Sequence, residues 1–297
     1  MQAARLSVPV SQGITPELRH SERLAALATQ ALIAEAELTP KPGLVDQRGA
    51  GAHHDLSLPL MRRSANSLKP YFAMMAFVSA GCNIDARLRE ELAAIGRSAE
   101  RAMYNVTLGG NTHKGAIWTL GLLVAAAARA EHQNAAEIPS MAGAIARLPL
   151  RALPASITHG DVARMRYGAV GARGEAWNGF PHVTGYGLPV LRERRRAGCS
   201  EEVSRLDALL AMMARLDDTC VLYRGGAEAL SLVKSGAKAV LAAGGYGHSS
   251  GRRQLRQLDR ELIARHISPG GSADLLAATI LLDALERDQS AANLAQS

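Results

Sequence analysis

The sequence predicts an all-α protein that folds as a single multi-helix globular domain. Hydrophobic residues make up 47% of the 297 residues and charged residues 21%, so the chain can bury a sizeable core. Alanine and leucine dominate the apolar residues and aromatic residues make up only 4%, a bias that favours helix over strand. Apolar residues recur at helical spacing along nearly the whole chain, without a convincing set of alternating strands.

This spacing predicts eleven helices, the first of which we expect Ser21 to cap. The last segment, "SADLLAATILLDAL", is apolar on nearly all sides, which predicts a buried central helix. Residues 1–20 are expected to form a flexible tail, residues 21–297 the catalytic domain, and "AEHQNAAEIP" a variable loop. The expected helices cover residues 21–35, 62–80, 86–104, 115–132, 141–148, 157–167, 183–197, 200–216, 226–243, 251–266 and 272–285.

The segments between these helices combine glycine and proline with charged or histidine side chains. Such loops often form a site on a rigid helical scaffold. Because they extend from residue 37 to residue 274, one site built from them requires one domain. We therefore expect a site made of Gly/Pro-rich inter-helix loops.

The formal net charge of +7 is compatible with a polyanionic partner. The densest basic run, Arg192–Arg196, has no aromatic neighbour, so we interpret it as a solvated helix end and expect no nucleic-acid partner. Three widely spaced cysteines favour a reducing cytoplasm. No apolar signal-peptide core is present at the N-terminus, and the apolar run at 117–128 is too short to span a bilayer, so we expect no membrane partner.

Cations beside small residues are a second pattern. No P-loop, Rossmann, HExxH or GxSxG motif is present. A single such cation is usually a surface residue, but several on glycine-rich loops favour a grip on phosphates, because a small neighbour lets an anion approach the backbone. The five cations in such loops are Lys41, Arg48, Lys114, Arg173 and Arg224.

The segment "NTHKG" precedes an apolar helix. Asn111 or Thr112 there could simply cap the helix. A helix start also offers free N–H donors and a partial positive charge that suit a phosphate. His113 and Lys114 are not needed for capping, which favours the phosphate interpretation.

Acidic residues in the loops suggest a magnesium site. Asp217 and Asp218 are adjacent, and Asp274 begins the last apolar helix. Mg²⁺ commonly bridges carboxylates to substrate phosphates, so we expect these three residues as metal ligands. The alternative is that they are solvated acids at helix ends.

Taken together, the loops resemble the ATP:dephospho-CoA triphosphoribosyltransferase family from about Glu35 to Leu282. The resemblance rests on "PKPGLVD", "GAHHDL", "NTHKGAIWTLG", "THG", "GARGEAWNGFP", "DDTCVLYRGG" and "SPGGSADLLAATILL". It implies a helical enzyme in which the 2′-hydroxyl of 3′-dephospho-CoA attacks C1′ of the ATP ribose and adenine leaves. The product would be the prosthetic-group precursor of an acyl carrier protein.

The resemblance assigns site residues as expectations. Glycosyl transfer at C1′ passes through an oxocarbenium-like state that carboxylates stabilise, for which we expect Asp55, Glu175, Asp218 and Asp274. The expected substrate-binding residues are Lys41, Arg48, His53, Asn111, His113, Lys114, Arg173, Arg224, Ser268, Gly270, Gly271 and Ser272.

Two positions depart from the family pattern: Gly110 stands where valine is expected and Cys220 where asparagine is common. This variation favours the malonate decarboxylase branch over citrate lyase. One alternative function is an ADP-ribosylglycohydrolase-like, Mg²⁺-dependent hydrolase, and another is a non-catalytic regulator that binds nucleotide or CoA. The assembly state also stays open, with a homodimer as one option.

Overall fold

The computed structural model describes residues 15–129, 135–150 and 158–296, and within them it is all-α, as the sequence predicts. The only β-type pairing in these residues is one isolated bridge between Asp46 and Gly49. The helices are α1 (Pro16–Glu37), α2 (Leu58–Ser79), α3 (Ala86–Val106), α4 (Lys114–Ala127), η1 (Ala135–Glu137), α5 (Ile138–Arg147), α6 (His159–Tyr167), α7 (Gly171–Trp177), η2 (Val183–Gly187), α8 (Leu188–Arg196), α9 (Glu201–Met213), α10 (Thr219–Ala242), α11 (Ser249–Ala264) and α12 (Gly270–Gln296).

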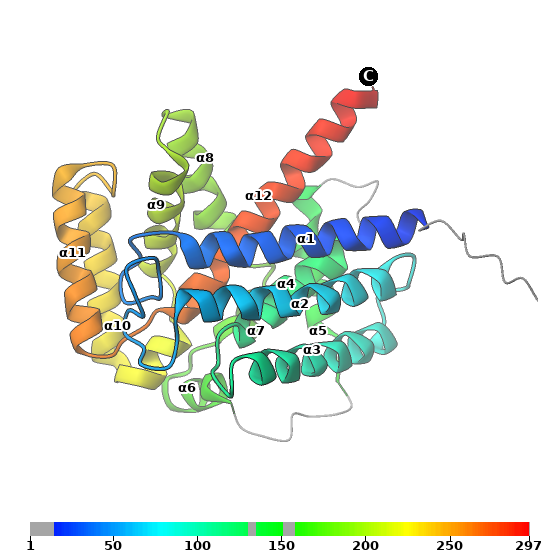
Figure 1. Ribbon diagram of the computed structural model, residues 1–297, viewed down its shortest axis with the longest axis horizontal. Coiled ribbons are helices and arrows are strands. Elements are labelled where there is room, and N and C mark those ends of the chain that lie inside the picture. Colours follow the sequence, from blue (N-terminus) through cyan, green and yellow to red (C-terminus); the bar gives the residue numbers. More distant parts are fainter. Residues whose placement is uncertain (1–14, 130–134, 151–157, 297) are drawn as a thin grey trace, which may run out of the picture.

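The helices surround α12, which crosses the middle of the molecule (Figure 1). Helices α1, α2 and α3 lie side by side as a layer on one side of it, and α10 pairs with α11 at one end of the molecule. Helix α12 packs against α1, α4 and α9. This arrangement brings the N-terminal end of α12 to the loops that follow α1 and precede α4.

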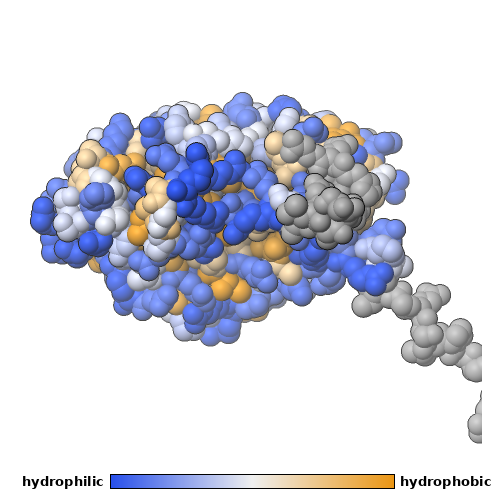
Figure 2. Space-filling view, turned by 90° about the horizontal axis from the view of Figure 1, so that it is seen from above, coloured by the Kyte–Doolittle hydropathy of each residue, from blue (hydrophilic) through white to orange (hydrophobic). Residues whose placement is uncertain are grey.

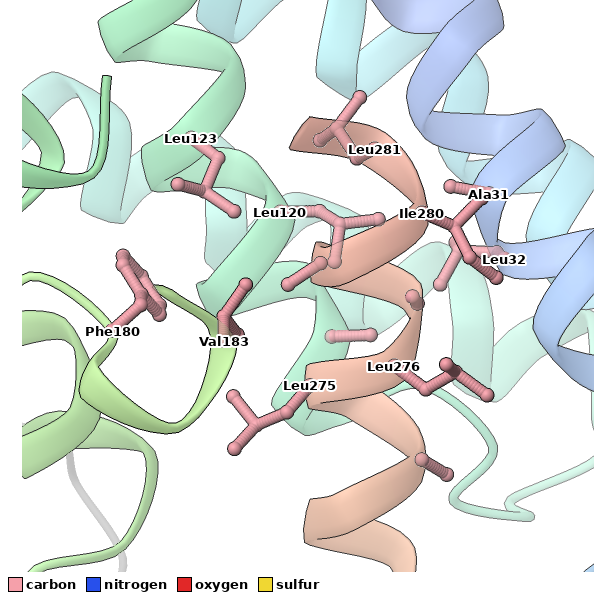
Figure 3. Packing of buried hydrophobic residues seen from close by; sticks show 14 of the residues in the cluster. Ala31, Leu32, Leu120, Leu123, Phe180, Val183, Leu275, Leu276, Ile280 and Leu281 are labelled. Carbon is pink, nitrogen blue, oxygen red and sulfur yellow. The ribbon is translucent and has the colours of Figure 1, made fainter. Parts of the chain in front are cut away.

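The core forms where α12 meets α1 and α4 (Figure 3). Leu276 and Ile280 of α12 face Leu32 of α1, while Leu120 and Leu123 of α4 lie on its other side. All five side chains are nearly fully buried, and such burial is the main stabilising contribution to a helical domain. The expected central helix is confirmed, because its apolar residues face neighbours all round.

The first helix begins earlier than the sequence analysis predicts. Thr15 caps it by accepting a hydrogen bond from the N–H of Leu18, and the helix begins at Pro16. Ser21 is therefore not a cap: it is buried inside the helix and donates its hydroxyl to the carbonyl of Glu17 at 2.9 Å. Residues 16–20 are helical, whereas the rest of the expected tail up to residue 14 lies outside the described residues.

Other differences arise where glycine interrupts the pattern. Helix α7 forms within a segment expected to be a loop, and the helix expected over 183–197 divides into the π-helix η2 and α8. Helix α10 begins at Thr219, and its backbone breaks at Gly226, whose φ of 69° is left-handed. Of the expected variable loop, residues 130–134 lie outside the described residues and 135–137 form η1.

Hydrophilic residues cross the centre of the face shown in Figure 2. Arg195 on α8 forms ion pairs with Glu201 on α9 and with Asp283 on α12, so part of the basic run Arg192–Arg196 is held in ion pairs. Every helix in the described ranges is too short or too polar to cross a bilayer.

Candidate functional site

The starts of α4, α10 and α12 meet near the end of α1, and two carboxylates connect them. Asp218 caps α10 and also accepts hydrogen bonds from the start of α12. Asp274, in the first turn of α12, lies against Gly115 and accepts a hydrogen bond from the N–H of Ala116 in α4. Glu35, near the end of α1, is close enough for its charge to act on Asp274. Four distant segments therefore bring polar groups to one place.

Asp218 is buried and fully engaged with backbone donors. One oxygen accepts from the N–H of Cys220 at 2.9 Å, with longer contacts from Val221 and Gly271. The other accepts from the N–H of Ser272 at 2.8 Å and from its hydroxyl at 2.9 Å. Burial raises the pKa of Asp218, while the hydrogen bonds from Ser272 act in the opposite direction. This carboxylate ties two helix starts together and has little capacity left for a ligand.

Asp274 has a different environment. It is half-buried, whereas Asp218 is buried. Burial, followed by the nearby charges of Glu35 and Asp218, raises the pKa of Asp274 well above its usual value, and the N–H of Ala116 is the opposing influence. A carboxyl group in these surroundings can hold a proton and exchange it with a bound molecule.

Lys41 and Glu35 form a buried ion pair beside these carboxylates. The Lys41 side chain is 1% exposed, and its Nζ donates to Oε1 of Glu35 at 2.5 Å and to the Glu35 carbonyl at 2.6 Å. The backbone N–H of Lys41 donates to Asp46. Lys41 therefore neutralises Glu35 and holds the loop after α1, so its ammonium group already has a counter-charge.

His113, at the start of α4, is buried and neutral. Burial, followed by the charge of Lys41, lowers the pKa of His113 to about 3. Its Nδ1 lies 2.9 Å from the hydroxyl of Ser64, which in turn contacts Thr112. Its Nε2 is buried and has no hydrogen-bond partner among the described residues. The imidazole at this position therefore adds no positive charge of its own to the start of α4.

A second polar group lies where the loop after α1 meets the end of α11. His53 Nε2 lies 2.9 Å from the hydroxyl of Ser268, and Arg224 lies 3.3 Å from His53 Nδ1. Burial, followed by the charge of Arg224, lowers the pKa of His53 to about 4. Arg48 in the same loop binds Asp46 and Asp259 and so acts as a cross-link between the loop and α11.

The predicted glycines permit close approaches within the site. A Cβ on Gly115 would lie 2.0 Å from Oδ2 of Asp274, and a Cβ on Gly271 would lie 2.9 Å from Oδ1 of Asp218. Gly270 faces the sulfur of Cys220. Asn111 accepts a hydrogen bond from the N–H of Lys114 at 3.3 Å, but the N-cap residue of α4 is His113, whose side chain makes no capping bond.

Several predicted site residues have partners outside this carboxylate cluster. Asp55 is 68% exposed at its side chain and lies 3.7 Å from His53. Glu175 is buried and contacts Nδ1 of His182 at 2.5 Å. Lys114 forms an ion pair with Glu100 at 3.4 Å, and Arg173 lies over the ring of Trp177 on the surface.

The three expected metal ligands do not assemble. Asp217 is 59% exposed and bound to Lys234, whereas its neighbour Asp218 is directed into the protein. Among the described residues, no group of three or more histidine, cysteine, aspartate or glutamate side chains is arranged to hold a metal ion. The expected set of Asp217, Asp218 and Asp274 therefore stays a prediction, although the oxygens of Asp218 already accept hydrogen bonds from two helix starts.

Two members of the cluster were not assigned by the sequence analysis. Glu35 looks like an ordinary helix acid in the sequence, and only the fold brings it to Asp274. The Cys220 thiol lies beside Gly270, and burial, followed by the charge of Asp218, raises its pKa, so it stays protonated. A surface hollow of about 360 Å³ lies elsewhere, between α5 and the segment after α7.

Residues 21–293 match the family model described as CitG, ATP:dephospho-CoA triphosphoribosyl transferase. The chain is 54% identical to a protein of Azotobacter vinelandii, over 90% of this chain and 92% of that protein. It is also 54% identical to a protein of Pseudomonas paraeruginosa, over 91% of this chain and 93% of that protein. Both relatives carry the name probable 2-(5''-triphosphoribosyl)-3'-dephosphocoenzyme-A synthase. No solved structure matches the chain.

Proposed function

Because the chain belongs to the ATP:dephospho-CoA triphosphoribosyl transferase family, we propose that it transfers the 5-triphosphoribosyl group of ATP to the 2′-hydroxyl of 3′-dephospho-CoA and releases adenine. The observation that carries this proposal is the 54% identity over nine tenths of both chains. The comparisons confirm the resemblance drawn from the loop motifs.

In this reaction the 2′-oxygen of dephospho-CoA bonds to C1′ of the ATP ribose as the C1′–N9 bond breaks. The electron pair of that bond leaves with adenine, which must gain a proton, while the attacking hydroxyl loses one. Asp274 suits both transfers because its raised pKa favours the protonated form and the residue is only half-buried. It donates its proton to adenine and takes one back from the 2′-hydroxyl.

The surroundings of Asp274 maintain this role. Glu35, although paired with Lys41, still raises the pKa of Asp274, and the neutral His113 adds no cation that would lower it. Asp218 does not take part in proton transfer, because its oxygens hold α10 and α12 in place. The overall charge of +7 favours the approach of two polyanionic substrates.

We propose that Mg²⁺ enters with ATP and is held by the oxygens of the triphosphate. Asp274 carries a proton in this mechanism and the oxygens of Asp218 accept hydrogen bonds from two helix starts, so neither carboxyl group is needed as a ligand. When bound, the ion would neutralise part of the triphosphate charge. The departures at Gly110 and Cys220 support a role in supplying the carrier protein of malonate decarboxylase in preference to that of citrate lyase.

Incubation with ATP, Mg²⁺ and 3′-dephospho-CoA, followed by mass analysis, tests the reaction. We expect adenine in equal amount to a product that contains dephospho-CoA plus the triphosphoribosyl group. Formation of ADP or AMP would contradict the proposal. Adenine release without dephospho-CoA would favour the ADP-ribosylglycohydrolase-like alternative, and binding without turnover would favour a regulator.

A further inference from the structure

Each of the two tryptophans of the chain carries an arginine over its ring. The guanidinium carbon of Arg89 on α3 lies 4.5 Å from the ring centroid of Trp118 on α4. Arg173 on α7 lies 6.0 Å from the ring centroid of Trp177 on the same helix. The two arginines are close enough for the charge of Arg173 to act on Arg89. Three helices therefore place two cations and two indoles in one region.

Arg89 is buried without a counter-ion. The residue is 3% exposed, yet it forms no ion pair and no hydrogen bond among the described residues. Burial lowers the pKa of Arg89 to about 10. The charge of Glu90 acts in the opposite direction and the repulsion of Arg173 adds to the lowering, and Arg89 is still charged at neutral pH. A buried charge without a partner is costly, and proteins usually keep one only where an anion binds.

Two buried N–H donors in this region lack an acceptor. Arg89 Nε and Trp118 Nε1 are both buried, and neither has a hydrogen-bond partner among the described residues. Because the Arg89 guanidinium lies over the Trp118 ring, an oxygen-rich anion bound here could accept from both side chains. Arg173, exposed and without an ion pair among the described residues, supplies a second charge near Arg89.

The region adjoins the carboxylate cluster through the helices that carry it. Trp118 lies one turn beyond Lys114, the first residue of α4. Gly115, in the same first turn of α4, lies against Asp274 of α12. Helix α7 begins at Gly171, where an added Cβ would lie 2.9 Å from Thr219, the residue after Asp218. A substrate bound at Asp274 could therefore extend along α4 and α7 toward the arginines.

We propose that Arg89, Trp118 and Arg173 form a subsite that binds the phosphoanhydride of a nucleotide substrate. Two arginines that form no ion pair among the described residues match a ligand with at least two negative charges, which a diphosphate or triphosphate provides and a single carboxylate does not. The choice of a nucleotide substrate rests on the proposed function, whereas binding of the phosphoanhydride itself does not. The triphosphate of ATP and the diphosphate of dephospho-CoA share this chemistry.

Tryptophan fluorescence tests the subsite without any turnover. Trp177→Phe leaves Trp118 as the single tryptophan, and inorganic pyrophosphate is the probe. We expect a saturable change in Trp118 emission that Arg89→Gln weakens about ten- to a hundred-fold. Arg87→Gln is the matched control, because Arg87 is exposed two residues away on the same helix and its loss changes the net charge equally.

Folding of the variants is checked by thermal unfolding without ligand. Because Arg89 forms no ion pair among the described residues, Arg89→Gln should not unfold at a lower temperature than Arg87→Gln. If Arg89→Gln does unfold at a lower temperature, Arg89→Lys replaces it in the titration. Arg89→Lys should then bind pyrophosphate more weakly than wild type. Equal pyrophosphate affinity for Arg87→Gln and the folded Arg89 variant would overturn the proposal, and a bound water would then account for the two unpaired donors.

Steady-state kinetics identify which substrate uses the subsite. With adenine release as the readout, we expect the Arg89 variant to raise KM for either ATP or dephospho-CoA about tenfold or more, with a smaller change for the other. Unchanged KM for both substrates would overturn the assignment to a substrate. If wild type binds pyrophosphate but releases no adenine, the proposed function fails and the anion subsite stands.

Discussion

The starts of α10 and α12 both carry a partly or fully buried aspartate, but the two carboxylates have opposite surroundings. Asp218 accepts five hydrogen bonds and is sealed from solvent. Asp274 has one backbone donor, two acidic neighbours and a partly open face. Many donors make an aspartate a structural cap, whereas few donors and nearby negative charge make it a proton carrier. Residue type and position at a helix start do not distinguish Asp218 from Asp274 in the sequence.

The largest expected effect is a loss of stability at Asp218. Asp218→Ala leaves the N–H groups of Cys220 and Ser272 without an acceptor at two helix starts. Each unsatisfied buried donor costs about 1–3 kcal/mol, so we expect a loss of roughly 3–5 kcal/mol in the free energy of unfolding, measured by urea denaturation. Asp217→Ala is the control and should cost less than about 1 kcal/mol, because its ion pair with Lys234 is largely exposed. Equal losses of unfolding free energy in Asp218→Ala and Asp217→Ala would contradict a structural role for Asp218.

Acid should destabilise the protein through His113. Its folded pKa of about 3 lies below the ordinary value of 6.5, so between these values the unfolded chain binds the extra proton. Stability therefore falls as pH falls through this window, by up to about 1.4 kcal/mol per pH unit. His113→Gln should reduce this dependence in urea unfolding at pH 4 to 7 and leave the smaller share that comes from His53, whose pKa is lowered to about 4, whereas His54→Gln, at an exposed site, should keep the full dependence. A parallel pH profile for wild type and His113→Gln would show that His113 does not stay neutral.

Gly115→Ala tests the role of Asp274 with a smaller expected effect on stability than Asp218→Ala. A methyl group at Gly115 would lie 2.0 Å from Oδ2 of Asp274 and must displace that carboxyl group. We expect Gly115→Ala to reduce kcat for adenine release about ten- to a hundred-fold, while the free energy of unfolding falls by no more than about 1–3 kcal/mol. Gly96→Ala is the control, because an added Cβ there meets one ordinary contact at 3.7 Å. Normal kcat in folded Gly115→Ala would show that the position of Asp274 is unimportant.

Helical spacing was sufficient to predict most of the fold, including the buried course of α12. It did not predict α7, because glycines in "GARGEAWNGFP" suggest a loop and the helix depends on packing against α4 and α5. The sequence placed Ser21 as a cap because it precedes the apolar pattern, but Thr15 and Pro16 give the helix an earlier start.

The site was predictable in its segments but not in the roles of its residues. The adjacent acids Asp217 and Asp218 cannot be separated in a sequence, yet one faces Lys234 and the other the helix starts. Lys41 is a loop cation in the sequence, and only the fold pairs it with Glu35. Arg89 resembles a surface residue of a charged helix, and its burial depends on the neighbouring helix α4.

The most direct test is to measure unfolding and adenine release for Asp274→Asn and Asp218→Asn at pH 7. Deprotonation of a carboxyl group with a raised pKa costs stability as pH rises, so Asp274→Asn should unfold at the same or a higher urea concentration than wild type. Its rate of adenine release should fall about 10²–10⁴-fold. Asp218→Asn should lose stability while its folded fraction keeps most of the activity. Full activity in Asp274→Asn, or stability loss without loss of activity, would contradict the assignment of proton transfer to Asp274.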